Sequence, residues 1–266
     1  MANSIARRDF IASSIIVATV AETGTVVASP QTGKKQEFYE LRIYRNENGD
    51  KQKLISRYLE NGLVPSLSRQ GIDRVGVFTL MESGDDASIA VLIPYPTLEV
   101  FAELNPKLEA DSSYMAAAKD MLAQPKEDPP FQRIESKFFK AFSGMPVIEM
   151  PAQTRSNKPR IFELRTYESH NPERAARKVE MFNSGEIQVM RDVEMAPVFF
   201  GEALIGADVP NLAYMLSADD MEAHKAHWKA FSAHPEWNRM KVMEKYKDTV
   251  SKITSLFLIP TSYSQI

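Results

Sequence analysis

The chain has 266 residues, of which 44% are hydrophobic and 25% are charged, proportions typical of a globular protein. Its 32 basic and 35 acidic side chains give a formal charge of −3, which offers no electrostatic case for binding nucleic acid or an anionic membrane surface. No cysteine is present, so disulfides, thiolate metal sites, iron–sulfur clusters and cysteine nucleophiles are excluded.

The N-terminal segment has the pattern of an export signal. Arg7 and Arg8 precede a mildly apolar run over Ile11–Val20, and Val26–Ala28 supplies small residues of the kind found at cleavage sites. The paired arginines are similar to those of the twin-arginine signal. Residues 1–28 are therefore expected to be a signal peptide of a periplasmic or extracellular protein that keeps no membrane segment after cleavage. The alternative is an amphipathic or disordered tail.

The rest of the chain repeats itself at an offset of 123 residues. Phe38–Tyr44 recurs as Ile161–Tyr167, and Ile89–Leu92 recurs as Leu212–Met215, with no gap in the register between them. Such a repeat predicts two copies of one small module that bury a face against each other, because each copy is small for an independent core. The predicted boundaries are a first module over 36–142, a linker over 143–159 and a second module over 160–266.

In the first module, the alternation of apolar and polar residues in Tyr39–Tyr44 predicts a half-buried strand. Apolar residues at helical spacing from Leu54 to Leu63 predict a helix, for which Gly71 is the expected end. The elements expected after it are strands over Val75–Met81 and Ser88–Ile93, a helical region from Thr97 to Leu122 and a closing strand over Ile134–Phe142.

The second module follows the same plan. Asn171 and Pro172 are a typical cap and first-turn residue, and together they predict where its first helix begins. Its later elements are expected to be strands over Val198–Ile205 and Leu212–Leu216, a helical region over Asp219–Lys247 with Ser217 as its N-cap, and a strand over Ile253–Ile259.

Each module therefore has the β-α-β-β-α-β order of a ferredoxin-like unit, and the predicted class is α+β. A sheet with helices on one face leaves its other face uncovered, so the two modules are expected to join these faces in an intramolecular pseudo-twofold α/β barrel. The polar residues of the two opening strands are then expected on the enclosed side; they are Glu40, Arg42 and Tyr44, with Glu163, Arg165 and Tyr167.

Two sets of motifs resemble the NIPSNAP family. The opening strands share the form Tyr/Phe-Glu-Leu-Arg-x-Tyr, and the second half adds His-Trp-x-x-Phe over His227–Phe231 and His-Pro-Glu-Trp over His234–Trp237. The resemblance covers 38–142 and 160–259 and implies the dimeric α/β-barrel arrangement of ferredoxin-like modules. It implies no particular reaction, since the family has no agreed set of catalytic residues.

The first module departs from this resemblance at the tryptophans. At the 123-residue offset, Asn105 stands in place of Trp228 and Tyr114 in place of Trp237, so the first module is not expected to share the role of that pair. The two tryptophans either line a ligand pocket or belong to the core, which is the usual place for aromatic residues at such spacing.

Two histidines are the candidates for metal binding or base catalysis. His224 and His227 are three residues apart on a predicted helix and share a face, where neutral imidazoles could bind a metal or accept a proton. The offset matches them to Phe101 and Leu104 of the first module, and apolar counterparts favour a packing role. No metal and no cofactor is therefore expected.

Arg42 and Arg165 each share a strand face with a glutamate and with Tyr44 or Tyr167. These groups could orient an anionic or enolic substrate, or each arginine could simply compensate its neighbouring glutamate. Their presence in both halves favours the structural role. The ligand-binding candidates that follow from both arguments are Arg42, Tyr44, Tyr167, Trp228 and Trp237.

Two functions of different classes remain open. The first is an exported module that binds a small, partly apolar molecule or a protein partner, and the lack of a nucleotide-binding glycine loop or nucleophile elbow favours it. The alternative is a cofactor-independent monooxygenase or isomerase acting on a small organic substrate in the barrel cavity. His224 or His227 would then be the base, and Arg165 would steady an oxyanion. A homo-oligomer is possible in either case.

Overall fold

A computed structural model describes residues 35–81 and 84–266 of the chain. The expected signal peptide over 1–28 lies outside these residues. Within the described part of the chain, no helix combines the length and the apolar character needed to cross a membrane.

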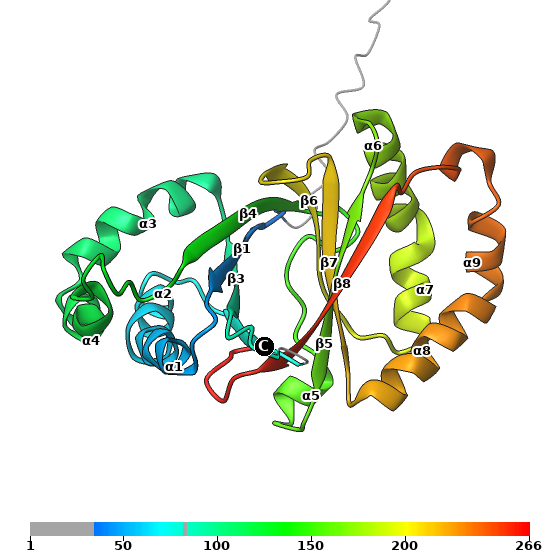
Figure 1. Cartoon of the computed structure of the whole chain (residues 1–266). Helices are drawn as coiled ribbons and strands as arrows, with labels where there is room; N and C mark the ends of the chain where they lie inside the picture. Colours follow the sequence, from blue (N-terminus) through cyan, green and yellow to red (C-terminus); the bar gives the residue numbers. More distant parts are fainter. Residues whose placement is uncertain (1–34, 82–83) are drawn as a thin grey trace, which may run out of the picture. The chain divides into compact units, whose positions relative to one another are not determined.

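The first module contains four strands and two helical segments, which follow β1 and β3 in the chain and lie beside the sheet (Figure 1). In chain order its elements are β1 (Phe38–Arg45), α1 (Gly49–Tyr58), the π-helical turn η1 (Leu59–Leu63), α2 (Val64–Arg69), β2 (Gly76–Leu80), β3 (Ile89–Tyr95), α3 (Leu98–Ala110), α4 (Ser112–Leu122) and β4 (Arg133–Ala141).

The short helix α5 (Ala152–Arg155) precedes the second module. The elements that follow are β5 (Ile161–Glu168), α6 (Pro172–Met181), the π-helical turn η2 (Phe182–Glu186), α7 (Ile187–Asp192), β6 (Pro197–Ile205), β7 (Asn211–Ala218), α8 (Met221–Ala233), α9 (Pro235–Met240), the 3₁₀ turn η3 (Glu244–Tyr246) and β8 (Lys252–Pro260).

The structure confirms the repeat, although only part of it keeps the 123-residue offset at both ends of an element, and β8 begins 119 residues after β4. Helices α1, α2 and α3 and the turn η1 begin and end 123 residues before α6, α7, α8 and η2. A π-helical turn therefore interrupts the first helix of each module at the same position, which the sequence pattern did not predict. Such turns are rare and recur at functional sites.

Capping explains most helix boundaries. Asn171 accepts a hydrogen bond from the backbone N–H of Arg174, which confirms the predicted start of α6 at Pro172. The predicted cap at Ser217 is wrong, because β7 continues to Ala218. Asp220 caps α8 instead, accepting from the first-turn N–H groups.

The predicted barrel is confirmed. Eight strands of the described residues close in the order β1-β3-β2-β8-β5-β7-β6-β4, and every neighbouring pair is antiparallel. The modules join at two seams, where β2 pairs with β8 and β4 pairs with β6. Within each module the order is that of a ferredoxin-like sheet, and closure removes its edges.

The enclosed side of the barrel is an apolar core made by both modules. Tyr39 packs edge-on against Phe199 with ring centroids 5.2 Å apart, and Phe78 meets Phe162 at 5.0 Å, so both contacts cross between modules. Other fully or nearly fully buried members are Leu41, Leu92, Phe139, Leu164, Val198, Met215 and Leu258.

The expectation that the Glu-Arg-Tyr faces are enclosed is therefore wrong. Tyr44 packs against Tyr58 of α1, and Arg165 lies over Trp228 of α8, so these faces point outward to the helices. An eight-stranded barrel is only wide enough for its own side chains. Charged groups placed there would lose water without gaining partners, whereas the sheet–helix layer supplies both partners and partial solvent access.

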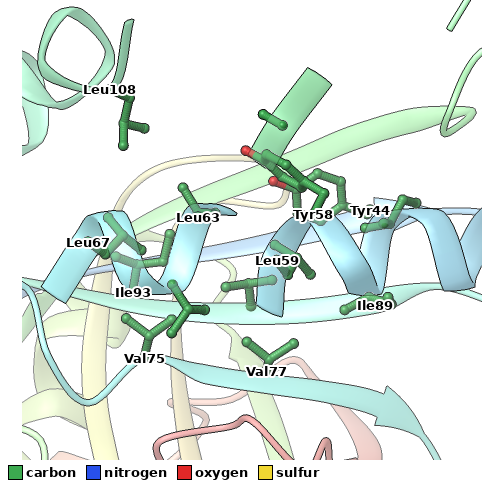
Figure 2. Packing of buried hydrophobic residues seen from close by; sticks show 14 of the residues in the cluster. Tyr44, Tyr58, Leu59, Leu63, Leu67, Val75, Val77, Ile89, Ile93 and Leu108 are labelled. Atoms are coloured by element: carbon green, nitrogen blue, oxygen red, sulfur yellow. The ribbon is translucent and has the colours of Figure 1, made fainter. Parts of the chain in front are cut away.

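The outer layer of the first module is a closed apolar core (Figure 2). Leu63 and Leu67 lie over Ile93 of β3, and Tyr58 lies beside Tyr44. In this half the space between sheet and helices is filled. The second module uses the same layer differently.

Candidate functional site

A pocket of about 460 Å³ opens in the second module between the outer face of its sheet and its helices. Strands β5 and β8, helices α6, α8 and α9, the turn η2 and the segment after α9 all contribute to its lining. The lining residues are Arg165, Tyr167, Lys178, Met181, Glu186, Trp228, Phe231, Ser232, Trp237, Lys241, Tyr246, Asp248, Thr249, Val250 and Ile253.

One wall of the pocket is aromatic. Phe231 stands between the two tryptophans, with ring centroids 5.3 Å from Trp228 and 4.7 Å from Trp237. The spacing of α8 places Trp228 and Phe231 on one face, and the break at His234 turns α9 so that Trp237 joins them. Both tryptophans of the chain are therefore at this pocket.

Arg165 forms the polar floor of the pocket. Its guanidinium lies 4.5 Å from the ring centroid of Trp228 and 5.4 Å from that of Tyr167. Among the described residues it donates a single hydrogen bond, from Nη1 to Glu163 at 2.7 Å, and its buried Nε has no partner. Arg42 at the matching position donates three, two to Glu40 and one to Tyr44. Arg165 thus has N–H groups free to donate to a ligand, whereas the corresponding groups of Arg42 already donate to Glu40 and Tyr44.

Glu163 holds both Arg165 and Trp228 in place by accepting a hydrogen bond from each. It accepts the 2.9 Å hydrogen bond from the indole N–H of Trp228, and Nε2 of His224 lies 3.5 Å from the same oxygen. Burial lowers the pKa of His224, with Arg165 adding to the effect and Glu163 opposing it. His224 is buried and is not among the residues lining the pocket, so it supports Trp228 and Glu163 rather than facing the space.

The other predicted residues divide between the modules. Tyr167, Trp228 and Trp237 come together with Arg165 at the pocket. His227 lines a separate hollow with Gln153 and Asp219, away from Arg165. Arg42 and Tyr44 lie in the first module and do not reach the pocket.

A buried ion pair at the pocket was missed by the sequence reasoning. Lys178 on α6 and Glu186 at the end of η2 lie 2.6 Å apart, with side chains only 5% and 2% exposed. The Lys178 ammonium also lies 4.5 Å from the ring centroid of Phe182. Burial raises the pKa of Glu186, although Lys178 opposes this. The 123-residue offset would have revealed the pair, because it matches these positions to apolar Ile55 and Leu63.

The first module fills the corresponding space. Ile55 and Leu63 are fully buried, and the hydroxyls of Tyr58 and Tyr114 meet at 3.0 Å where the second module has Met181 and Trp237. Only a hollow of about 140 Å³ remains beside Tyr58. The pocket is thus a property of one half of a duplicated fold.

No group of three or more histidine or acidic side chains with metal-binding geometry occurs in residues 35–81 or 84–266. The pocket itself offers basic, aromatic and hydroxyl groups and two carboxylates, of which Glu186 is paired with Lys178. Its chemistry suits an oxygen-bearing organic molecule better than a cation.

Replacing Arg42 with methionine should destabilise the protein in a pH-dependent way. Burial alone would raise the pKa of Glu40, but the charge and hydrogen bonds of Arg42, aided by Ser136 and Tyr95, bring it below its ordinary 4.5. A lowered carboxyl pKa contributes stability above 4.5 that is lost as the pH falls through the folded-state value. The variant should therefore lose about 3 kcal/mol near neutrality. The difference in stability from wild type should narrow as the pH falls through the raised pKa of Glu40 in the variant and then through its lowered pKa in the wild type. Urea unfolding across this pH range measures it, and a gap independent of pH would contradict the assignment.

Comparisons with known proteins agree with the fold. The NIPSNAP family model matches residues 162–265, which correspond to the second module. The chain is similar to the crystal structure of a proposed monooxygenase from Lactobacillus acidophilus, with 12% identity, a TM-score of 0.57 and coverage of 85% of this chain and 94% of that one. A second proposed monooxygenase, from Fusobacterium nucleatum, has 9% identity, a TM-score of 0.54 and coverage of 85% and 93%.

A NIPSNAP-like domain protein from Burkholderia xenovorans is 21% identical over 40% of this chain and 88% of that one, with a TM-score of 0.36. Comparison with the curated proteins gave no match. At these identities the two full-length likenesses show the fold, and only the fold.

Proposed function

We propose that the second module, whose residues 162–265 match the NIPSNAP family model, binds a small, partly apolar molecule that carries an acidic or carbonyl oxygen. The observation that carries this proposal is the difference between the modules. The same layer is filled by Tyr58 and Tyr114 in the first half and is open around Arg165 in the second.

The lining indicates the class of ligand. The aromatic wall of Trp228, Phe231 and Trp237 suits the face of a flat ring. The volume of the pocket lies within the usual range for small-molecule sites. Arg165 is partly desolvated and retains free donors, which favour a carboxylate, phenolate or enolate oxygen. Lys241 and Asp248, which carry opposite charges, both lie at the exposed rim of the pocket.

A concave site of this kind favours a small molecule over a protein partner, which would need a much larger surface. The alternative function, a monooxygenase or isomerase with a histidine base, has little support from the geometry of the pocket, because His224 and His227 do not line it. Export to the periplasm or beyond is part of this proposal and rests on the sequence of residues 1–28 alone.

Tryptophan fluorescence tests the proposal, because both tryptophans line the pocket. Arylacetates, arylpyruvates and phenolates are titrated, and at least one should give a saturable change. Arg165→Met should weaken the binding of such an acidic ligand by roughly tenfold or more, since hydrogen bonds to charged groups contribute about 1.5–3 kcal/mol. Arg42→Met, at the matching position of the first module, should leave the affinity unchanged.

A closing variant gives the second arm of this test. Met181→Tyr combined with Trp237→Tyr copies the Tyr58 and Tyr114 pair of the first module and should fill the pocket while Trp228 remains as reporter. Binding should then be lost, whereas Tyr58→Phe should have no effect on it. Binding that survives in the closed variant would exclude this pocket as the ligand site.

A further inference from the structure

The buried Lys178–Glu186 pair occupies positions where the fold itself does not require charge. The first module has Ile55 on α1 and Leu63 on η1 at these positions, and both are fully buried. These elements correspond to α6 and η2 of the second module. A buried ion pair usually contributes no more stability than apolar residues of similar size. The same fold therefore forms with an apolar pair in one module and with an ion pair in the other. The need to fold does not explain the ion pair.

The pair lies where a bound molecule would touch it. Lys178 and Glu186 both line the pocket, and the Lys178 ammonium is held among the rings of Phe182, Tyr167 and Trp237 at 4.5, 5.5 and 5.6 Å. Glu186 is the last residue of η2. The acidic member of the pair therefore belongs to the π-helical turn itself.

Resting on the proposed binding function, we propose that Lys178 and Glu186 are an acid–base pair that interconverts the keto and enol forms of an aryl carbonyl compound bound in this pocket. Arg165 would hold the carboxylate of the ligand, and the aromatic wall would hold its ring. The reaction is an isomerisation, so it needs no oxidant, reductant or second substrate.

The proton balance closes within the pair. The Glu186 carboxylate removes a proton from the carbon next to the carbonyl, and the electrons of that C–H bond form the carbon–carbon double bond. The carbonyl π electrons move to oxygen, which takes a proton from the Lys178 ammonium. Glu186 then returns its proton to the neutral Lys178 amine across their 2.6 Å contact, which restores both groups.

The environment suits a base of this kind. Burial raises the pKa of Glu186, which makes its carboxylate a stronger base than an exposed one. The charge and hydrogen bond of Lys178 oppose this rise and so favour the carboxylate form that the step requires. Next to them, the hydroxyl of Tyr214 donates to that of Tyr167 at 2.8 Å, so Tyr167 can in turn donate toward the pocket.

Exchange of the phenylpyruvate α-protons for solvent deuterium, followed by proton NMR, tests this inference on the full protein. The exchange rate should rise in proportion to protein concentration above the buffer rate. Glu186→Gln should lower the protein-dependent rate by about 100-fold or more, the usual contribution of a general base. Its affinity for phenylpyruvate, read from tryptophan fluorescence, should change much less than its rate.

Two further variants keep the test decisive. Lys178→Ile with Glu186→Leu copies the packing of the first module, so it should fold and should lose all protein-dependent exchange. Glu60→Gln, an exposed glutamate on the π-helical turn of the first module, should leave exchange unchanged. Saturable binding without protein-dependent exchange would overturn this inference and leave the binding function standing. Failure of every acidic aryl ligand to bind would overturn both.

Discussion

Glu186→Leu alone should lower the free energy of unfolding by about 3–5 kcal/mol, because it leaves the ammonium of Lys178 buried without its counter-charge. The neighbouring aromatic rings offset only part of that loss, since a cation–π contact contributes about 0.5–2 kcal/mol. Urea unfolding followed by far-UV circular dichroism measures the change.

Adding Lys178→Ile to that variant should recover the lost stability to within about 1 kcal/mol of wild type or better, because apolar replacements of buried pairs are often neutral or stabilising. The first module is the matched control, since Ile55 and Leu63 already occupy these positions there. A double variant no more stable than Glu186→Leu would contradict this expectation and would mean that the pair is needed for folding.

Phe199→Ala should also destabilise strongly, by about 3–5 kcal/mol, because it opens a cavity in the packed interior of the barrel. Phe199 is fully buried and contacts Tyr39 and Phe139 across the seam between modules. Ligand affinity should not change, since the pocket lies on the outer side of the sheet.

Leu204→Ala on the same strand is the matched control; it is 46% exposed and should change stability by less than about 0.5 kcal/mol. Both stability and affinity are measured on the same preparations by unfolding and fluorescence titration. A large gain or loss of ligand affinity in Phe199→Ala, without such a change in Leu204→Ala, would indicate that the ligand binds in the barrel interior.

The repeat carried most of the fold prediction. An offset of 123 residues between the halves was enough to predict the element order, and two incomplete sheets explain why a barrel closes. The pattern could not say which face of β1 is enclosed. Both faces are largely buried, and alternation has the same period whichever side faces inward.

The candidate site was predicted only in part. Arg165, Tyr167, Trp228 and Trp237 do meet, because strand and helix periods place them on facing surfaces. The Lys178–Glu186 pair was missed because charges on an amphipathic helix are normally solvated, and because the π-helical turn shifts which side Glu186 faces. No local pattern contains that shift.

The joining of two modules in one polypeptide has a consequence for stoichiometry. A barrel built from two identical subunits must present every pocket twice, because each amino-acid change appears in both halves. A fused pair is free of that constraint, so the half filled by Tyr58 and Tyr114 can act as a rigid scaffold that completes the strand pairing. The half that contains Arg165 can then specialise, and each chain should take up one ligand with no cooperativity between its halves.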